Sequence, residues 1–117
     1  MESHLKANSQ MKKPISKQDV QRKQKENRVV RLIDIRTAAE YEKKHVPGAI
    51  NIPSEQLSDE LGMFGKDDTM ICICNYGKER GQQAAEFLCN AGFENTFYLE
   101  GGTAEWCNDD SSITPNR

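Results

Sequence analysis

The sequence lacks the features that mark several classes of protein. None of its 117 residues lies in an apolar run near the roughly 18 residues of a membrane-spanning helix. Residues 1–14 contain no apolar segment, so a secretory signal is not expected. The four cysteines form no Cys-x-x-Cys pair, and neither histidine stands at ligand spacing. These absences favour a reduced protein of the cytosol that uses no metal and no cofactor.

The chain also lacks an even distribution of charge. Residues 1–44 hold twelve Lys/Arg against six Asp/Glu, whereas residues 45–117 hold four against twelve. The basic excess centres on residues 17–28, where no aromatic side chain interleaves the cations and no nucleic-acid-binding motif is present. We therefore interpret this segment as a solvated helix face. Neither a nucleic acid nor a membrane is expected as a partner.

The length is that of one domain. Residues 1–13 are assigned to a disordered or cloning-derived lead, residues 14–110 to the folded domain, and residues 111–117 to a polar tail. Within the domain, short apolar segments at 29–36, 49–53, 69–74 and 95–102 read as strands. Helices are expected at 15–27, 54–62, 81–92 and 103–109, with a short one starting at a Thr37–Glu40 capping box.

This alternation of strands and helices is typical of a parallel sheet that helices cover on both faces. Ligands of such sheets bind at the carboxyl ends of the strands. Two features fall there: Cys74 ends the apolar segment TMICIC, and Gly101–Gly102 follow the last strand. The sequence therefore predicts an α/β domain with its functional rim near Cys74.

A polar loop joins Cys74 to the helix expected near Gly81. Converging backbone N–H groups and the positive end of a helix dipole form an anion site. The same field favours the thiolate, which is the nucleophilic form of cysteine. Gly77 suits a position of positive φ, and Arg80 adds a planar cation for an oxyanion. Together these residues predict a nucleophilic cysteine in an anion-binding loop.

Three blocks of the sequence resemble the rhodanese-homology family. They are LIDIRTAAEYEKKHVPGAINIP (32–53), ICICNYGKERGQQAAEFL (71–88) and YLEGGTAEW (98–106). The resemblance implies a three-layer α/β fold with a central parallel sheet of about five strands. It implies that Cys74 takes a sulfane sulfur from a donor such as thiosulfate and passes it, through a persulfide, to a thiol or cyanide. The implied partners are a small anionic donor and a thiol acceptor, protein thiols included, and we expect a monomer.

The loop departs from the usual sulfurtransferase pattern. Five residues separate Cys74 from Arg80. Counted from Cys74 to the helix residues AAEFL, the loop is one residue longer than in most single-domain sulfurtransferases. That length resembles the rhodanese-fold dual-specificity phosphatases and arsenate reductases. In this alternative, Cys74 attacks phosphorus or arsenic, Arg80 clamps the oxyanion and Glu79 is the candidate general acid. That branch usually has a histidine directly before the cysteine, whereas this sequence has Ile73, which favours sulfur chemistry. A non-catalytic regulatory domain is the third alternative.

Under sulfur transfer, Arg80 and the loop amides are expected to stabilise the sulfite that leaves. The residues expected to surround the sulfur are Asn75, Tyr76, Gly77, Lys78, Glu79 and Gly81. Asp34 and Arg36, at the end of the first long strand, are expected to form an internal ion pair that holds the strand to a helix, with orientation of the active loop as the alternative. Cys72 and Cys89 are expected to pack in the core, whereas Cys107 has no assigned role. Thr103 stands where the family often has a bulky aromatic, which is expected to open the rim slightly.

Overall fold

A computed structural model describes residues 13–26 and 29–113, with side chains up to residue 107. Its centre is a sheet whose strands are all parallel, in the order β1-β5-β4-β2-β3. The strands are β1 (Pro14–Ile15), β2 (Val30–Asp34), β3 (Ile50–Asn51), β4 (Thr69–Ile73) and β5 (Thr96–Leu99). The helices are α2 (Lys17–Lys25), α3 (Ala38–Lys43), α4 (Glu79–Asn90), α5 (Gly102–Ile113) and the 3₁₀ helix η1 (Ser54–Met63). The three-layer α/β prediction is confirmed.

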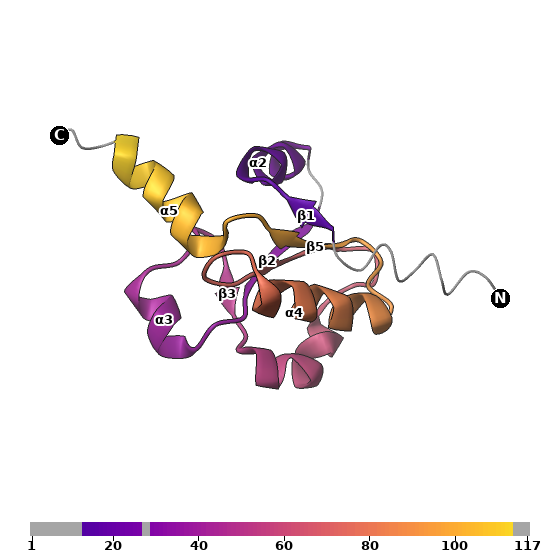
Figure 1. Ribbon diagram of the computed structural model, residues 1–117. Coiled ribbons are helices and arrows are strands. Elements are labelled where there is room, and N and C mark those ends of the chain that lie inside the picture. Colours follow the sequence, from indigo (N-terminus) through magenta and orange to yellow (C-terminus); the bar gives the residue numbers. More distant parts are fainter. Residues whose placement is uncertain (1–12, 27–28, 114–117) are drawn as a thin grey trace.

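Helices cover both faces of the sheet. In Figure 1, α2 and α5 lie above the strands, and α4 lies below them. Alternate residues of the central strand β4 enter the two cores, because successive side chains of a strand point to opposite faces. Met70 and Cys72 join the core under α4 and η1, whereas Ile71 and Ile73 join the core under α2 and α5. Cys74 continues this alternation and lies on the α4 side.

The expected strands are present, with one addition. β1 has only two residues, which pair with Tyr98 and Leu99 at the edge of the sheet. A strand of two residues is too short to produce a hydrophobic period, so it could not be predicted from the sequence. It nevertheless buries Ile15, of which only 4% is exposed.

The predicted helix starts are partly right. Ser16 caps α2 by accepting the Asp19 N–H, and Thr37 and Glu40 form the expected capping box of α3. The segment expected as a helix from residue 54 is instead the 3₁₀ helix η1, and the Ser54 side chain does not cap it. The reason is that η1 begins at Ser54 itself, so Pro53, which has no side-chain acceptor, occupies the N-cap position. The Ser54 N–H donates to the carbonyl of Ile35 at 3.1 Å, where the chain leaves the sheet.

The last helix is longer than expected. α5 starts one residue before the predicted 103–109 segment and continues to Ile113, so it includes three residues assigned above to the polar tail. Most of the predicted lead, residues 1–12, and residues 114–117 of the tail lie outside the described residues. Among the helices of the described part, none is long and apolar enough to cross a membrane.

Candidate active site

Cys74 lies directly after the central strand β4, between the ends of β5 and β2. Its relative exposure is only 3%, and its side chain belongs to the core that α4 and η1 cover. A parallel sheet places its ligand sites at the carboxyl ends of such strands. The structure therefore places the candidate nucleophile where the sequence predicted it.

The loop after Cys74 packs tightly against the turn between β5 and α5. Gly77 has a φ of 72°, and a Cβ there would lie 2.5 Å from the Gly101 nitrogen and from the Leu99 carbonyl oxygen. Across the same contact, the N–H of Thr103 donates to the Cys74 carbonyl and the N–H of Ala104 donates to the Asn75 carbonyl, each at 2.9 Å. Two N–H groups at the start of α5 thus hold the loop by its carbonyls. Only glycine at position 77 permits this approach.

The N-terminus of α4 meets the thiol from the other side. The first backbone hydrogen bond of this helix runs from the Gln82 N–H to the Lys78 carbonyl. The N–H groups of residues 79–81 precede that bond and have no acceptor within the helix. An ideal Cβ on Gly81 would lie 3.1 Å from Cys74 Sγ. The sulfur therefore lies against the amide end of α4, where a negative charge is stabilised.

A buried ion pair fixes the far side of the loop. The Arg36 guanidinium donates to both carboxylate oxygens of Asp34, with Nη2 2.8 Å from Oδ2 and Nε 2.9 Å from Oδ1. Its Nη1 donates to Asn75 Oδ1 at 3.0 Å. Hydrogen bonding to Asp34 is the largest cause that raises the pKa of Arg36. The expected pair is present, and it also positions the residue that follows the nucleophile.

Asn75 is held from two directions. Its Oδ1 accepts from Arg36, and its Nδ2 donates to Glu40 Oε2 at 3.1 Å. Hydrogen bonds from the Thr37 backbone and from Asn75 lower the pKa of Glu40 to about 2. The sequence indicated Glu40 only as a capping residue, since the distance of 35 positions to Asn75 leaves no local signal. Glu40 thus links the start of α3 to the active loop.

Arg80 and Glu79 do not lie where the loop count placed them. α4 begins at Glu79, so both residues are in its first turn and the loop from Cys74 ends at Lys78. The irregular loop therefore comprises residues 75–78, and the last two residues of the counted spacing, Glu79 and Arg80, are helical. Arg80 is exposed, and its Nη2 lies 3.5 Å from Glu40 Oε1. α4 starts two residues before the predicted Gly81, shortly after the turn at Gly77, whose φ is 72°.

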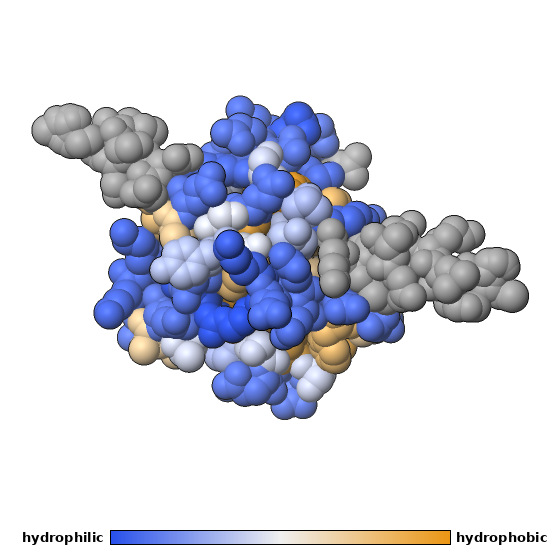
Figure 2. All heavy atoms as spheres, in the orientation of Figure 1, coloured by the Kyte–Doolittle hydropathy of each residue, from blue (hydrophilic) through white to orange (hydrophobic). Residues whose placement is uncertain are grey.

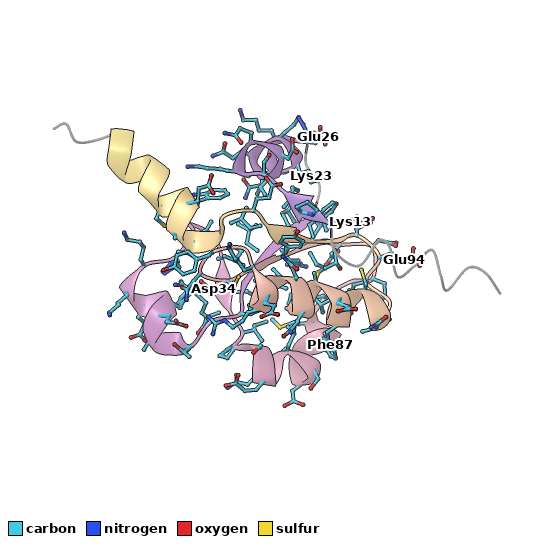
Figure 3. All side chains as sticks on the ribbon, in the orientation of Figure 1. Lys13, Lys23, Glu26, Asp34, Phe87 and Glu94 are labelled. Carbon is cyan, nitrogen blue, oxygen red and sulfur yellow. The ribbon has the colours of Figure 1, made fainter. Side chains whose placement is uncertain are left out.

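The remaining loop residues differ in exposure. Tyr76 is 64% exposed, and the side chains of Lys78 and Glu79 also face solvent. Gly81 is buried beside the sulfur. Figure 3 labels Asp34, the buried carboxylate of the supporting pair, on the side of the sheet nearest α3. The loop and the first residue of α4 thus present an aromatic ring, a cation and an anion outward around a buried thiol.

Cys72, Cys89 and Cys107 form no disulfide within the described part of the chain. Cys72 is fully buried, and burial raises its pKa, which makes it a packing residue as expected. Cys89 is only half-buried, and partial burial raises its pKa. Of the four, Cys74 alone combines a strand end, a glycine loop and a helix N-terminus.

Comparison with known proteins agrees with this geometry. The sequence model of the rhodanese-like domain matches residues 16–109. The chain is 32% identical over 81 residues to the thiosulfate sulfurtransferase GlpE of Shewanella oneidensis, an alignment that covers 69% of the chain and 79% of GlpE. It superposes on the human single-domain sulfurtransferase TSTD1 with a TM-score of 0.72 and 26% identity, covering 81% of the chain and 95% of TSTD1. A rhodanese-related protein of Thermoplasma volcanium gives a TM-score of 0.71 and 27% identity, with 83% and 92% covered. The chain belongs to the rhodanese-like domain family.

Proposed function

We propose that this protein is a sulfurtransferase that carries sulfane sulfur on Cys74. The observation that carries the proposal is the position of Cys74 Sγ beside Gly81 in the first turn of α4, where an added Cβ would lie 3.1 Å from the sulfur. A persulfide is an anion at neutral pH, and the unpaired N–H groups of a helix start stabilise an anion. The name of the similar GlpE protein, a thiosulfate sulfurtransferase, supports the same reaction.

The reaction has two steps. First, the Cys74 thiolate attacks the outer sulfur of thiosulfate, a new S–S bond forms, and sulfite leaves with the electron pair of the broken bond. Second, an acceptor thiolate attacks the outer sulfur of the persulfide and releases the Cys74 thiolate. Neither step needs an external oxidant or reductant. The N–H groups of residues 79–81 stabilise the charge at the sulfur in both steps.

Arg80 is assigned to the mouth of the site in this proposal. Its guanidinium is exposed beside Glu40, where it can attract an anionic donor and stabilise the departing sulfite. Lys78 on the loop adds to this attraction. The phosphatase alternative requires Arg80 to clamp an oxyanion over the loop, and no observation favours that position, because Arg80 pairs with Glu40 at the side. We therefore do not propose phosphate or arsenate chemistry.

The proposal extends to the setting of the protein. A persulfide carrier needs Cys74 as a free thiol, which a reducing compartment such as the cytosol maintains. The partners are a small anionic sulfur donor and a thiol acceptor, and the protein acts as a monomer.

Intact-mass spectrometry tests the proposal. The reduced protein is treated with thiosulfate, desalted and weighed beside the Cys74→Ser and Cys107→Ser variants. We expect a gain of one sulfur atom in the wild type and in Cys107→Ser, removable by cyanide, and none in Cys74→Ser. An adduct that persists in Cys74→Ser, or no adduct in the wild type, would refute the assignment.

A further inference from the structure

A hollow of about 450 Å³ opens beside the active loop, between the end of α3 and the start of α5. Arg36, Lys43 and Lys44 line it from one side, and Asn75, Tyr76 and Thr103 line it from the other. Its volume lies within the roughly 300–1,000 Å³ of sites for small molecules. Thiosulfate and cyanide are both far smaller than such a space.

The charge of this hollow is positive. Lys43 and Lys44 are exposed, and neither forms an ion pair with any residue in the described part of the chain. Arg36 is neutralised by Asp34, and the single carboxylate of the lining, Glu40, already faces Asn75 and Arg80. Two uncompensated ammonium groups therefore remain, in a protein whose net charge is −2.

The hollow is bordered by the residues that follow Cys74 in the chain, although Cys74 itself does not line it. Asn75 and Tyr76 are the next two residues after Cys74, and the Thr103 N–H donates to the Cys74 carbonyl at 2.9 Å. Only 3% of Thr103 is exposed, and its hydroxyl has no hydrogen-bond partner among the described residues. A buried hydroxyl without a partner costs free energy, so a polar group that reaches it on binding gains more than it would elsewhere. The short threonine also leaves open the space that an aromatic side chain would fill.

We propose that this hollow binds the carboxylates of a small acceptor thiol and so selects acidic thiols over neutral ones. The proposal rests on the sulfurtransferase function above. The thiol of the acceptor reaches the Cys74 persulfide while its carboxylates face Lys43 and Lys44. The face of the molecule in Figure 2 is mostly hydrophilic and has only small apolar patches, which suits a small polar molecule. The acceptor thiolate takes the outer sulfur, and the Cys74 thiolate leaves, as in the second step above.

The test measures sulfur transfer from protein that is already loaded. The Cys74 persulfide is formed with thiosulfate, excess donor is removed, and loss of the added sulfur mass is followed after mixing with mercaptosuccinate, a dicarboxylate, or with neutral 2-mercaptoethanol. The Lys43→Gln/Lys44→Gln double variant is compared with Lys23→Gln/Lys25→Gln, which removes the same charge from α2. Figure 3 shows Lys23 on the opposite side of the molecule from α3. The ratio of wild-type to variant rates cancels the different intrinsic reactivities of the two thiols.

We expect the Lys43/Lys44 variant to transfer to mercaptosuccinate more slowly by on the order of tenfold at low salt, from two partly exposed charge pairs. Its transfer rate with 2-mercaptoethanol stays within about twofold of the wild-type rate. Added salt should make the effect of the double substitution more similar for the two thiols. Equal losses for both thiols, or none, would overturn the proposal. A loss confined to the loading step would assign the lysines to the donor instead, and would overturn it too.

A binding measurement separates this proposal from the proposed function. Methylthiosuccinate has the carboxylates of the acceptor and no free thiol, so its affinity for the unloaded protein is independent of sulfur transfer. Calorimetry should give weaker binding to Lys43→Gln/Lys44→Gln than to the wild type and the α2 control. If thiosulfate fails to load the protein but methylthiosuccinate still binds more weakly to the Lys43→Gln/Lys44→Gln variant, only the sulfurtransferase assignment would be refuted. Equal affinities in all three proteins would refute the hollow as a carboxylate site.

Discussion

Replacing Gly81 with alanine should separate folding from sulfur chemistry. The new methyl group would lie 3.1 Å from Cys74 Sγ and 3.7 Å from Tyr98 Cβ. The first distance is about 0.5 Å shorter than the roughly 3.5–4.0 Å of an ordinary contact between heavy atoms, so the thiol must move. Gly81 is not among the glycines of positive φ, and alanine is favoured over glycine in a helix by up to about 1 kcal/mol. This gain offsets the cost of the displacement.

We therefore expect the free energy of unfolding of Gly81→Ala to stay within about 1 kcal/mol of wild type, a shift in Tm of less than about 8 °C. The rate of persulfide formation should fall by roughly tenfold or more, because a displacement of a reacting atom by about 1 Å can cost on the order of a hundredfold. Intact mass against time after thiosulfate addition measures the rate, and thermal unfolding by circular dichroism measures the stability.

Gly62→Ala is the matched control, because an ideal Cβ at Gly62 has no heavy atom within 4 Å. It should load at the wild-type rate. A Gly81→Ala protein that is as stable as wild type and loads equally fast would show that the sulfur does not need the space at Gly81. A variant that fails to fold would contradict the estimate that the helix tolerates the methyl group.

Three further predictions concern the supporting residues. Arg36→Ala should cost about 3–5 kcal/mol in urea unfolding, because it leaves the Asp34 carboxylate buried without its partner; a loss below about 1 kcal/mol would contradict this. The lowered pKa of Glu40, about 2 against an ordinary 4.5, means that its stabilising effect is complete above pH 4.5 and is lost as the pH falls toward 2. The wild type should therefore lose more stability than Glu40→Gln over that interval, and equal pH profiles would argue against it. Thr103→Val should leave stability unchanged or raise it, since it removes an unpaired buried hydroxyl, while it weakens the binding of methylthiosuccinate; a loss of stability would indicate a hidden partner for that hydroxyl.

The parts of the fold that the sequence predicted share a local cause. β4 (TMICI) has three β-branched residues among five, and β2 (VRLID) has three apolar residues among five, so the strand type of both follows from local composition. The capping box of α3 joins two residues three positions apart, so its signal is contained in the sequence itself. Cys74 was located because a strand end, a glycine and a following helix mark a ligand-binding loop in any parallel sheet.

The parts that the sequence did not predict depend on contacts between distant segments. η1 takes its 3₁₀ form where the chain leaves the sheet and donates to Ile35. The start of α4 depends on how Gly77 packs against Gly101 and Leu99, which lie more than twenty positions away. Counting residues between Cys74 and the apolar positions of the helix gives the same number whether the loop or the helix holds the extra one.

This ambiguity had a chemical consequence, because the loop length was the main argument for the phosphatase alternative. α4 starts at Glu79, the Cys74 thiol lies beside its first turn at Gly81, and the Arg80 guanidinium lies 3.5 Å from the Glu40 carboxylate. A metaphosphate-like transition state needs a cation at its equatorial oxygens, whereas a persulfide carries one negative charge that backbone N–H groups alone can stabilise. The position of the thiol beside the start of α4 and of Arg80 beside Glu40 thus favours sulfur over phosphorus.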